Sequence, residues 1–270
     1  MSALTELSVL TELSALTELK VALLQTELVW QDATANRQQL AAQLKDVQAD
    51  VVVLPEMFST GFSMLSSEIA EPEGETLAWL LRQAKQLGAA IVGSVATRLD
   101  SGCVNRCYFV TPEGDVSYYD KKHLFRMAGE HQAYQAGTER VVVAYRGWRI
   151  LLQVCYDLRF PVFSRNRNDY DIALYVANWP APRSHAWRTL LLARAIENQA
   201  YVLGCNRVGT DGNAIAYRGD SLIVDYLGQP QVDLAPDEAG ILTGTLDLTA
   251  LRQYRQQFPA HLDADEFSLL

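Results

Sequence analysis

The pattern of hydrophobic positions divides the chain into a short repetitive start and a long alternating remainder. Residues 2–19 contain three copies of a hexapeptide, in which Ser, Ala or Val, Leu, Thr, Glu and Leu follow one another. The resulting leucine at every third position drifts around an α-helix of about 3.6 residues per turn and does not maintain one apolar stripe. We therefore expect residues 1–19 to form a leader with a weakly docked helix, attached to a domain at residues 20–270. An expression artefact or a partner-binding arm would produce the same repeat.

From Lys20 onward, apolar runs of strand length alternate with amphipathic stretches of helix length. The predicted strands are residues 20–25, 50–54, 90–96, 103–110, 115–119, 140–145, 149–154, 171–177, 200–206, 220–226 and 240–246. The predicted helices are residues 34–48, 74–87, 161–168 and 186–199. Two connections, at residues 112–114 and 146–148, are short turns that indicate hairpins.

The order of these elements is similar in the two halves of the chain, and no linker rich in glycine or serine separates them. Helical crossovers imply parallel strand pairs, whereas hairpins imply antiparallel pairs, so the sheets should be mixed. Such sheets usually have helices on their outer faces and another sheet on their inner faces. The predicted fold is therefore a four-layer α-β-β-α sandwich of the α/β class.

The composition agrees with one globular domain, because 49% of the 270 residues are hydrophobic and 20% are charged. The formal net charge of −9 works against binding to nucleic acid or to an anionic membrane surface. The sequence also lacks the roughly 18 to 20 unbroken apolar residues of a membrane span and the basic, then apolar, start of a secretion signal. We expect a cytoplasmic protein without nucleic-acid or membrane partners.

The four cysteines are Cys103, Cys107, Cys155 and Cys205, too few for a disulfide scaffold in a chain of this length. In a reducing cytoplasm they would remain thiols. Cys103 and Cys107 have a loose Cys-x3-Cys spacing without a second pair, and both lie within a predicted strand. A zinc site is therefore not expected.

Polar residues follow three of the predicted strands, at the ends where α/β sheets tend to hold catalytic groups. These residues are Glu56, Lys121 and Cys155. Taken singly, each has a more common structural interpretation, because free cysteines are usually buried and loop glutamates and lysines are usually solvated. If the three side chains converge, Lys121 would lower the thiol pKa and Glu56 would transfer protons. A helix opening near Pro161 would add the positive end of its dipole behind Cys155.

The segments around these residues resemble the nitrilase, or carbon–nitrogen hydrolase, superfamily in residue type, order and approximate spacing. The matching segments are Leu-Pro-Glu-Met-Phe at 54–58, Tyr-Asp-Lys-Lys-His-Leu-Phe at 119–125 and Val-Cys-Tyr-Asp-Leu-Arg-Phe-Pro at 154–161. The resemblance extends from about Lys20 to about Phe258. It implies an α-β-β-α fold, a homodimer, and a Glu-Lys-Cys triad at Glu56, Lys121 and Cys155.

The same resemblance identifies two further residues. The family's lysine is separated by one residue from a His-Leu-Phe motif, which selects Lys121 over Lys122. Glu130 matches a second family glutamate, which would help to orient the substrate or Lys121.

The reaction that the resemblance implies begins with attack of the Cys155 thiolate on an amide carbonyl. Lys121 and the backbone N–H of Tyr156 would hold the oxyanion. Glu56 would deliver a proton to leaving ammonia and would then activate the water that hydrolyses the thioester. No metal or organic cofactor is implied.

Within the superfamily, segments 155–161, 178–180 and 193–201 look most like omega-amidases, which deamidate monoamides of 2-oxo dicarboxylic acids such as 2-oxoglutaramate. Such a substrate is an anion, so it needs a local cation, preferably an arginine for bidentate pairing. Arg159 is the candidate, and a structural ion pair to an acidic neighbour is the alternative. Phe58 and Trp179 would form apolar walls of a small pocket, unless they are simply packed.

Other functions remain open at this point. N-carbamoyl amino acid hydrolases have two adjacent arginines where this chain has Leu158 and Arg159, which counts against that activity. A true nitrilase, or a Cys-His hydrolase that uses His123 or His131, would be a different enzyme. Outside enzymes, the alternative is a non-catalytic binding or scaffolding protein on the same fold, with the leader as its docking arm.

Overall fold

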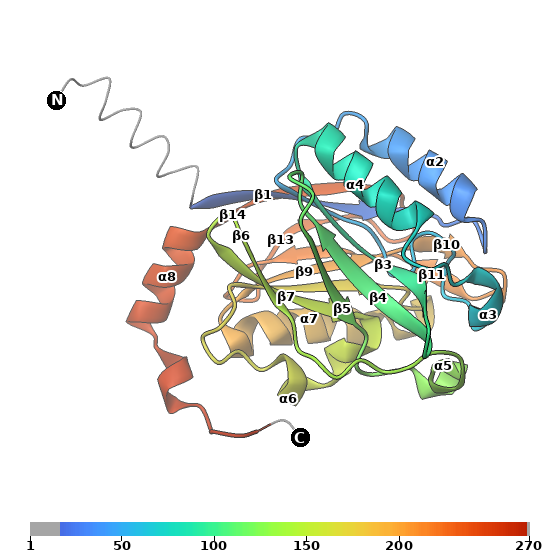
Figure 1. Ribbon diagram of the computed structural model, residues 1–270. Helices are drawn as coiled ribbons and strands as arrows, with labels where there is room; N and C mark the ends of the chain where they lie inside the picture. Colours follow the sequence, from blue (N-terminus) through green and yellow to red (C-terminus); the bar gives the residue numbers. More distant parts are fainter. Residues whose placement is uncertain (1–16, 269–270) are drawn as a thin grey trace.

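Two six-stranded mixed sheets form the centre of the structure, a computed structural model that describes residues 17–268 (Figure 1). Across the first sheet the strands are β14 (Gly240–Asp247), β1 (Glu18–Gln25), β2 (Val51–Val53), β3 (Ala90–Leu99), β4 (Gly102–Val110) and β5 (Val116–Asp120). Across the second sheet they are β13 (Pro230–Asp233), β12 (Leu222–Val224), β9 (Tyr201–Asn206), β8 (Ile172–Ala177), β7 (Trp148–Val154) and β6 (Val142–Tyr145). Strands β1, β2 and β3 are parallel, as are β7, β8 and β9, and the flanking strands are antiparallel.

Helices make the crossovers that several of the parallel strands require. Helix α2 (Ala33–Leu44) connects β1 to β2, α4 (Glu75–Leu87) connects β2 to β3, and α7 (Ser184–Asn198) connects β8 to β9. The other helices are α3 (Ser66–Ile69), α5 (Glu130–Ala133), α6 (Pro161–Ser164) and α8 (Leu248–Gln257), with 3-10 turns η1 (Arg126–Ala128), η2 (Cys155–Arg159), η3 (Ala181–Arg183) and η4 (Ala260–Asp263). A small hairpin, β10 (Val208–Thr210) and β11 (Ala216–Arg218), follows β9.

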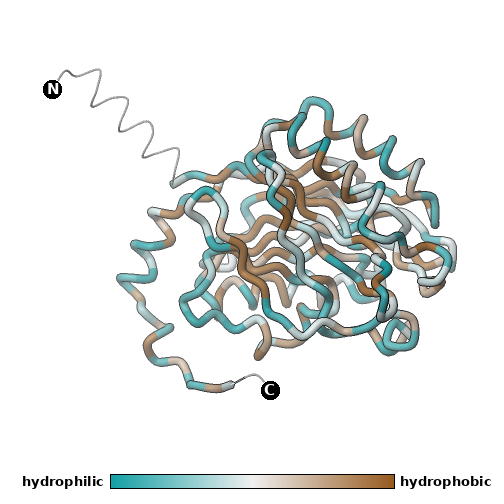
Figure 2. Tube along the Cα trace, in the orientation of Figure 1, coloured by the Kyte–Doolittle hydropathy of each residue, from teal (hydrophilic) through white to brown (hydrophobic). Residues whose placement is uncertain are grey.

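Apolar side chains hold the layers together. Residues of both sheets share one buried cluster, among them Val21, Val53, Leu152 and Leu174, and this cluster continues to Trp187 of α7. A second cluster joins the first sheet to α2 and α4 through Leu40 and Leu80. Figure 1 shows α2 and α4 on one side of the paired sheets and α7 on the other, and Figure 2 shows hydrophobic segments along the central strands. The predicted α-β-β-α sandwich is confirmed.

The predicted leader helix falls almost entirely on residues 1–16, which lie outside the described residues, so that helix stays a prediction. Strand β1 begins at Glu18, within the last copy of the repeat and two residues before the predicted domain start. Glu18 and Leu19 pair with Asp247 and Leu246 of β14, and Leu19 is fully buried. The final repeat residues therefore belong to the sheet.

Two predicted helical features differ from the structure. The helix expected at 161–168 ends at Ser164, because the Asn166 side chain donates hydrogen bonds to the carbonyls of Tyr170 and Asn198, both at 3.0 Å, and turns the chain. Helix α8 was not predicted. Only Leu248, Leu251 and Arg255 of this helix are buried. The helix therefore has too few apolar residues at helical spacing to be recognised from the sequence.

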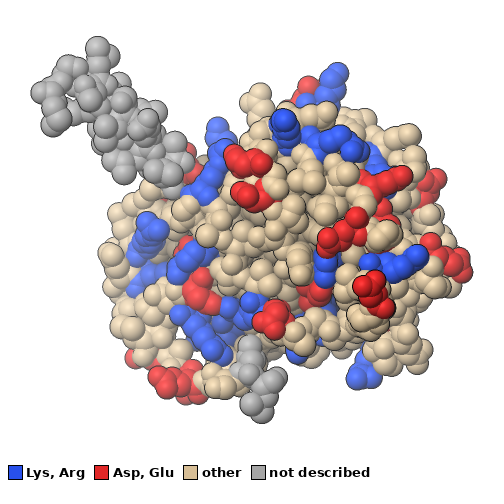
Figure 3. Space-filling view, in the orientation of Figure 1, with Lys and Arg blue, Asp and Glu red and all other residues tan. Residues whose placement is uncertain are grey.

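Within residues 17–268, no helix is both long enough and apolar enough to cross a membrane. On the face shown in Figure 3, Lys and Arg side chains lie among Asp and Glu side chains. That face therefore does not present the extended basic surface that is typical of nucleic-acid binding.

Candidate functional site

Three of the predicted side chains meet beyond the ends of β2 and β5. The Nζ atom of Lys121 lies 2.9 Å from Oε1 of Glu56 and 3.0 Å from each carboxylate oxygen of Glu130. All three side chains are fully buried. Lys122 is partly exposed, so the structure agrees with the choice of Lys121 for this cluster.

Two asparagines fix the orientation of the Glu56 carboxylate. Its Oε1 accepts a hydrogen bond from Nδ2 of Asn105, and its Oε2 accepts one from the backbone N–H of Asn178, both at 2.8 Å. Sequence reasoning missed both residues, because Asn105 lies inside β4 and Asn178 lies in a loop whose packing the sequence does not reveal. With Lys121, they give Glu56 three donors and therefore one defined direction.

One ammonium group compensates two buried carboxylates in this cluster. Burial lowers the pKa of Lys121, but Glu130 and Glu56 raise it by more, so Lys121 remains protonated. Burial raises the pKa of Glu130, the Lys121 charge lowers it, and Glu56 raises it, with a net upward direction. The cluster therefore holds an excess of negative charge when both carboxylates are ionised.

Cys155 directly follows β7 and begins η2 with a backbone φ of +46°. A positive φ is strained for a residue with a side chain, and such strain is often found at functional sites. Cys155 is 9% exposed and lines a pocket, whereas Cys107 and Cys205 are fully buried. Its position and conformation thus set it apart from the core thiols.

The pKa of the Cys155 thiol is well above its ordinary value. Burial is the largest cause, Glu56 raises the pKa as well, and Lys121 lowers it. Lys121 lowers the thiol pKa as predicted, but burial outweighs this one nearby cation, so the net direction is upward. A helix does begin at Pro161, but it has only four residues, and the contribution of its dipole stays a prediction. The resting thiol is neutral and needs a base before it can attack.

Asp157, which sequence reasoning missed, connects the cysteine segment to the lysine segment. Its Oδ2 accepts hydrogen bonds from the backbone N–H of Val154 and from the hydroxyl of Tyr119, both at 2.8 Å. Its Oδ1 accepts one from the backbone N–H of His123 at 3.0 Å and lies 2.8 Å from Nδ1 of the same residue. A fully buried aspartate two residues after the cysteine therefore holds together the turns that carry Cys155 and Lys121.

The two histidines that a Cys-His hydrolase would use do not line the pocket that contains Cys155. His123 pairs with Asp157 and stacks on Phe160 at 3.9 Å between ring centroids. His131 is exposed on α5. Glu56 does not line the pocket either, but its charge and its side-chain hydrogen bond are among the largest effects on the pKa of Cys155, and no histidine is among them. The surroundings of Cys155 therefore favour Glu56 as the base.

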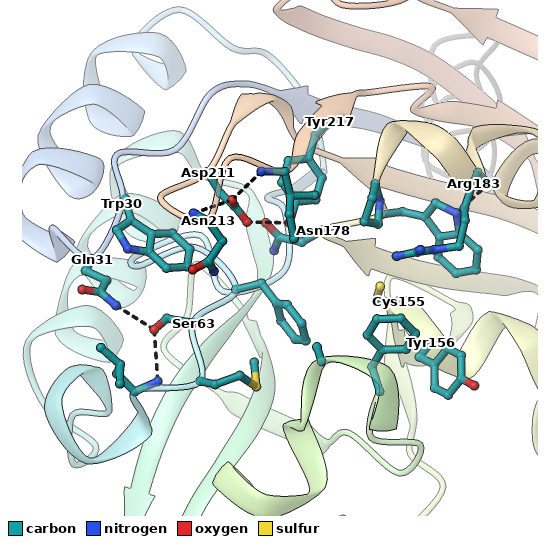
Figure 4. A pocket seen from close by; sticks show the side chains of 18 of the residues that line it. Trp30, Gln31, Ser63, Cys155, Tyr156, Asn178, Arg183, Asp211, Asn213 and Tyr217 are labelled. Carbon is teal, nitrogen blue, oxygen red and sulfur yellow. Dashed lines mark hydrogen bonds between the residues drawn. The ribbon is translucent and has the colours of Figure 1, made fainter.

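Cys155 lies in a pocket of about 560 Å³ (Figure 4). The apolar and aromatic residues that line it are Trp30, Phe62, Met64, Leu65, Phe125, Tyr156, Trp179, Pro180, Ile215 and Tyr217. The polar residues that line it include Gln31, Ser63, Asn178, Asp211, Asn213, Arg159 and Arg183. A mostly apolar pocket with a few polar groups is typical of a small-molecule site.

Two of the three residues predicted to contact the substrate line this pocket. The Arg159 guanidinium lies 4.9 Å from the ring centroid of Trp179. Among the described residues Arg159 forms no ion pair, so the alternative of a structural ion pair is not observed. The Tyr156 N–H is the second of η2, where the first N–H groups of a helix have no partner within it. Its role at an oxyanion stays a prediction.

The assignment of Phe58 to the pocket wall is wrong. Phe58 is fully buried in the cluster between the first sheet and its helices, with its ring 5.7 Å from that of Trp79. Its backbone N–H donates to the carbonyl of Ser94 in β3, which returns the chain to the sheet. Phe62, four residues later, lines the pocket instead, and Lys121 Nζ lies 5.1 Å from its ring centroid.

Within residues 17–268, no group of three or more His, Cys, Asp or Glu side chains has an arrangement suited to a metal ion. Asn178 and Arg183 also line the pocket. Asn178 lies in the segment 178–180 that resembles omega-amidases, but no role was predicted for it, and Arg183 lies outside that segment.

Known proteins resemble this chain over nearly its full length. The profile of the carbon–nitrogen hydrolase family matches residues 20–256. Omega-amidase YafV of Yersinia enterocolitica is 56% identical over 93% of this chain and 98% of its own. The 2-oxoglutaramate amidase of Bacillus subtilis is 36% identical over 80% of this chain and 85% of its own. The crystal structure of a CN-hydrolase superfamily protein from Xanthomonas campestris, with an arsenic adduct in its active site, is 48% identical, with a TM-score of 0.92 and coverage of 94% and 99%.

Proposed function

The chain belongs to the carbon–nitrogen hydrolase family, and from that premise we propose that it is an omega-amidase. The proposed reaction releases ammonia from the terminal amide of monoamides of 2-oxo dicarboxylic acids, such as 2-oxoglutaramate. The observation that carries this proposal is 56% identity to an omega-amidase over 93% of the chain. The pocket supports it, since Cys155 and two arginines line the same cavity.

In the proposed acylation, Glu56 takes the proton of the neutral Cys155 thiol, and the sulfur attacks the amide carbonyl carbon. Lys121 and the Tyr156 N–H stabilise the negative oxygen of the tetrahedral intermediate. Protonated Glu56 then gives its proton to the amide nitrogen, so ammonia leaves and a thioester remains. The three hydrogen bonds that Glu56 accepts hold its carboxylate in one orientation for these proton transfers.

In the proposed deacylation, Glu56 takes a proton from water as the water oxygen attacks the thioester carbonyl. The carbon–sulfur bond breaks, the carboxylic acid product forms, and Glu56 returns the proton to the Cys155 sulfur. Glu130 acts through Lys121, because both of its oxygens lie 3.0 Å from the ammonium nitrogen. No step in this cycle calls for a metal or an organic cofactor.

Ammonia release from a panel of 2-oxoglutaramate, glutamine, an N-carbamoyl amino acid and a simple nitrile tests the substrate. We expect 2-oxoglutaramate to have the highest kcat/KM. A preference for the nitrile or the carbamoyl compound would contradict the omega-amidase proposal and leave the Glu-Lys-Cys mechanism standing.

The variant Glu56→Gln tests the mechanism, and we expect it to abolish nearly all turnover. A Cys-His hydrolase would keep most of its activity in this variant. A non-catalytic scaffold would show no turnover with any compound in the panel and no covalent adduct on Cys155.

A homodimer in the cytoplasm is also proposed. The four cysteines are free thiols, which fits a reducing compartment. A sedimentation experiment at micromolar protein should give the mass of two chains, and the mass of one chain would contradict the dimer.

A further inference from the structure

Two arginines line the pocket without an acidic partner. Arg159 ends η2, and its guanidinium lies over Trp179 at 4.9 Å from the ring centroid. Arg183 ends η3, and its guanidinium lies over Phe125 at 5.2 Å. All four side chains line the cavity that contains Cys155. Within residues 17–268, neither arginine forms an ion pair.

Several other arginines of this protein use their donors on carboxylates. Elsewhere, Arg106 and Arg149 each donate from two nitrogens to both oxygens of one carboxylate, that of Asp120 and Asp171 respectively. Stacking on an aromatic ring occupies the face of a guanidinium but leaves the N–H groups along its edge available. Arg159 and Arg183 are therefore held in place while their donors remain free for a ligand.

Among the described residues, the one acidic side chain that lines the pocket lies apart from Arg183. Figure 4 shows Arg183 on the same side as Cys155 and Tyr156, with Asp211 on the other side. The Asp211 oxygens are already used, because they accept hydrogen bonds from the Tyr217 hydroxyl at 2.9 Å and from two backbone N–H groups. An anionic ligand in the pocket is therefore drawn toward the arginines.

The backbone around Arg183 is fixed relative to the pocket wall. Its carbonyl accepts a hydrogen bond from Nε1 of Trp179 at 2.8 Å, and its N–H donates to the carbonyl of Pro180 at 3.0 Å. Trp179 thus contacts both arginines, one through its ring face and the other through its indole N–H. The same tryptophan therefore helps to position both arginines.

We propose that Arg183 is a second substrate-binding residue, which together with Arg159 binds the carboxylate end of the substrate. A 2-oxo carboxylate presents two carboxylate oxygens and an adjacent keto oxygen. Two guanidinium groups can donate hydrogen bonds to all three oxygens more readily than a single guanidinium group can. The pair selects anionic monoamides over neutral amides of the same length. The inference rests on the proposed function for its substrate, but anion binding itself is measured without turnover.

The first test is calorimetric titration of the protein with 2-oxoglutarate, a dicarboxylate that needs no chemical step. We expect Arg183→Gln to weaken binding about 10- to 50-fold, as loss of a partly exposed charged hydrogen-bonding group predicts, and Arg183→Lys to restore part of it. Arg126→Gln is the matched control, because Arg126 is exposed on the nearby η1 and does not line the pocket. It should bind within about twofold of the parent if overall charge contributes little at physiological salt.

The second test compares turnover of succinamate with that of butyramide, its neutral counterpart. Arg183→Gln should raise KM for succinamate by a much larger factor than KM for butyramide, and circular dichroism checks that the variant is folded. Equal losses for both substrates, unchanged 2-oxoglutarate binding, or an equal loss in Arg126→Gln would overturn the inference. If the protein binds 2-oxoglutarate through Arg183 but hydrolyses no amide, the proposed function fails and the anion site stands.

Discussion

The buried cluster of Glu56, Lys121 and Glu130 depends on a single positive charge. Both carboxylates lie within 3.0 Å of the Lys121 nitrogen, and no water-exposed surface remains on any of the three. Removing the ammonium would leave two carboxylates buried close together, each without its main partner. The same ammonium is the proposed oxyanion donor, so stability and catalysis should fail together.

We predict that Lys121→Met lowers the free energy of unfolding by about 3 to 5 kcal/mol and abolishes measurable ammonia release. Lys122→Met is the control, since this neighbouring lysine is partly exposed and outside the cluster. Urea denaturation and an ammonia assay on both variants provide the check. A fully active, equally stable Lys121→Met protein is the result that this interpretation does not permit.

The raised pKa of Cys155 predicts how its thiol reacts when no substrate is bound. Because the thiolate forms only at high pH, iodoacetamide should alkylate Cys155 slowly at neutral pH. The alkylation rate should still increase with pH above 9.0, which is the ordinary pKa of a thiol. Glu56→Gln should move the profile to lower pH, because Glu56 raises the thiol pKa. Mass spectrometry of the Cys155 peptide gives the rates, and a plateau below pH 7 in the parent protein would contradict a neutral resting thiol.

Where a motif carries a residue, the sequence predicted its place: Glu56, Lys121 and Glu130 form one cluster and Cys155 lines the pocket, while their roles stay predictions. Prediction failed where the path of the chain after a strand decides the outcome. Phe58 and Phe62 are both aromatic residues just after β2, and only the return of the chain to Ser94 places the first in the core. Arg183 could not be found from sequence, because its aromatic support, Phe125, is distant along the chain.

At the scale of elements, Asp157 joins η2 to the end of β5. It accepts hydrogen bonds from Val154 just before Cys155, from Tyr119 in β5, and from His123 two residues after Lys121. Both of its oxygens are occupied by Val154, Tyr119 and His123, so we interpret Asp157 as a positioning residue that acts through the segments it joins. Its effect on the reaction should come through the relative placement of Cys155 and Lys121.

We predict that Asp157→Asn lowers kcat about 10- to 100-fold with little change in KM, because misplacement of reacting groups slows chemistry and leaves the pocket intact. Asp100→Asn, in the exposed turn between β3 and β4, is the charge-matched control. Steady-state kinetics with 2-oxoglutaramate distinguish the two parameters. An increase in KM at unchanged kcat would assign Asp157 to substrate binding and refute the positioning role.

Elements with a dense apolar pattern were predicted closely, including the central strands and the helices α4 and α7. The exceptions depend on tertiary partners. Helix α6 stops early because the Asn166 side chain caps backbone groups of a later segment. Helix α8 is held by Arg255, which pairs with Asp171 at 2.9 Å and donates a hydrogen bond to the Tyr170 carbonyl. Polar contacts of this kind do not produce a periodic pattern of apolar residues, so the sequence does not reveal them.

At the scale of the whole molecule, the sandwich buries groups that ionise in alkaline solution. Burial raises the pKa values of the thiols of Cys107 and Cys205 and of the phenols of Tyr119 and Tyr170. These groups stay neutral in the folded protein at pH values where they ionise in the unfolded chain. Their contribution to stability is therefore complete below the ordinary values of 9.0 and 10.0 and is lost as pH rises above them.

We predict that the free energy of unfolding falls between pH 8 and pH 10.5, by about 1.4 kcal/mol per pH unit for each group that has passed its ordinary pKa. Cys205→Ala should reduce that slope by the contribution of one group while lowering stability at all pH values. Urea denaturation across this range measures both quantities. A stability that is constant or rises toward pH 10.5 would be incompatible with neutral buried thiols and phenols.

The proposed reaction depends on a thioester at Cys155, from which the acid product is released. Rapid acid quench of the protein with 2-oxoglutaramate, followed by intact and peptide mass spectrometry, measures this intermediate directly. We expect a transient mass increase of one 2-oxoglutaryl group on the peptide that contains Cys155, with one ammonia released per adduct, and neither product in Cys155→Ala. An adduct on another residue, or ammonia release by Cys155→Ala at the parent rate, would contradict this reaction.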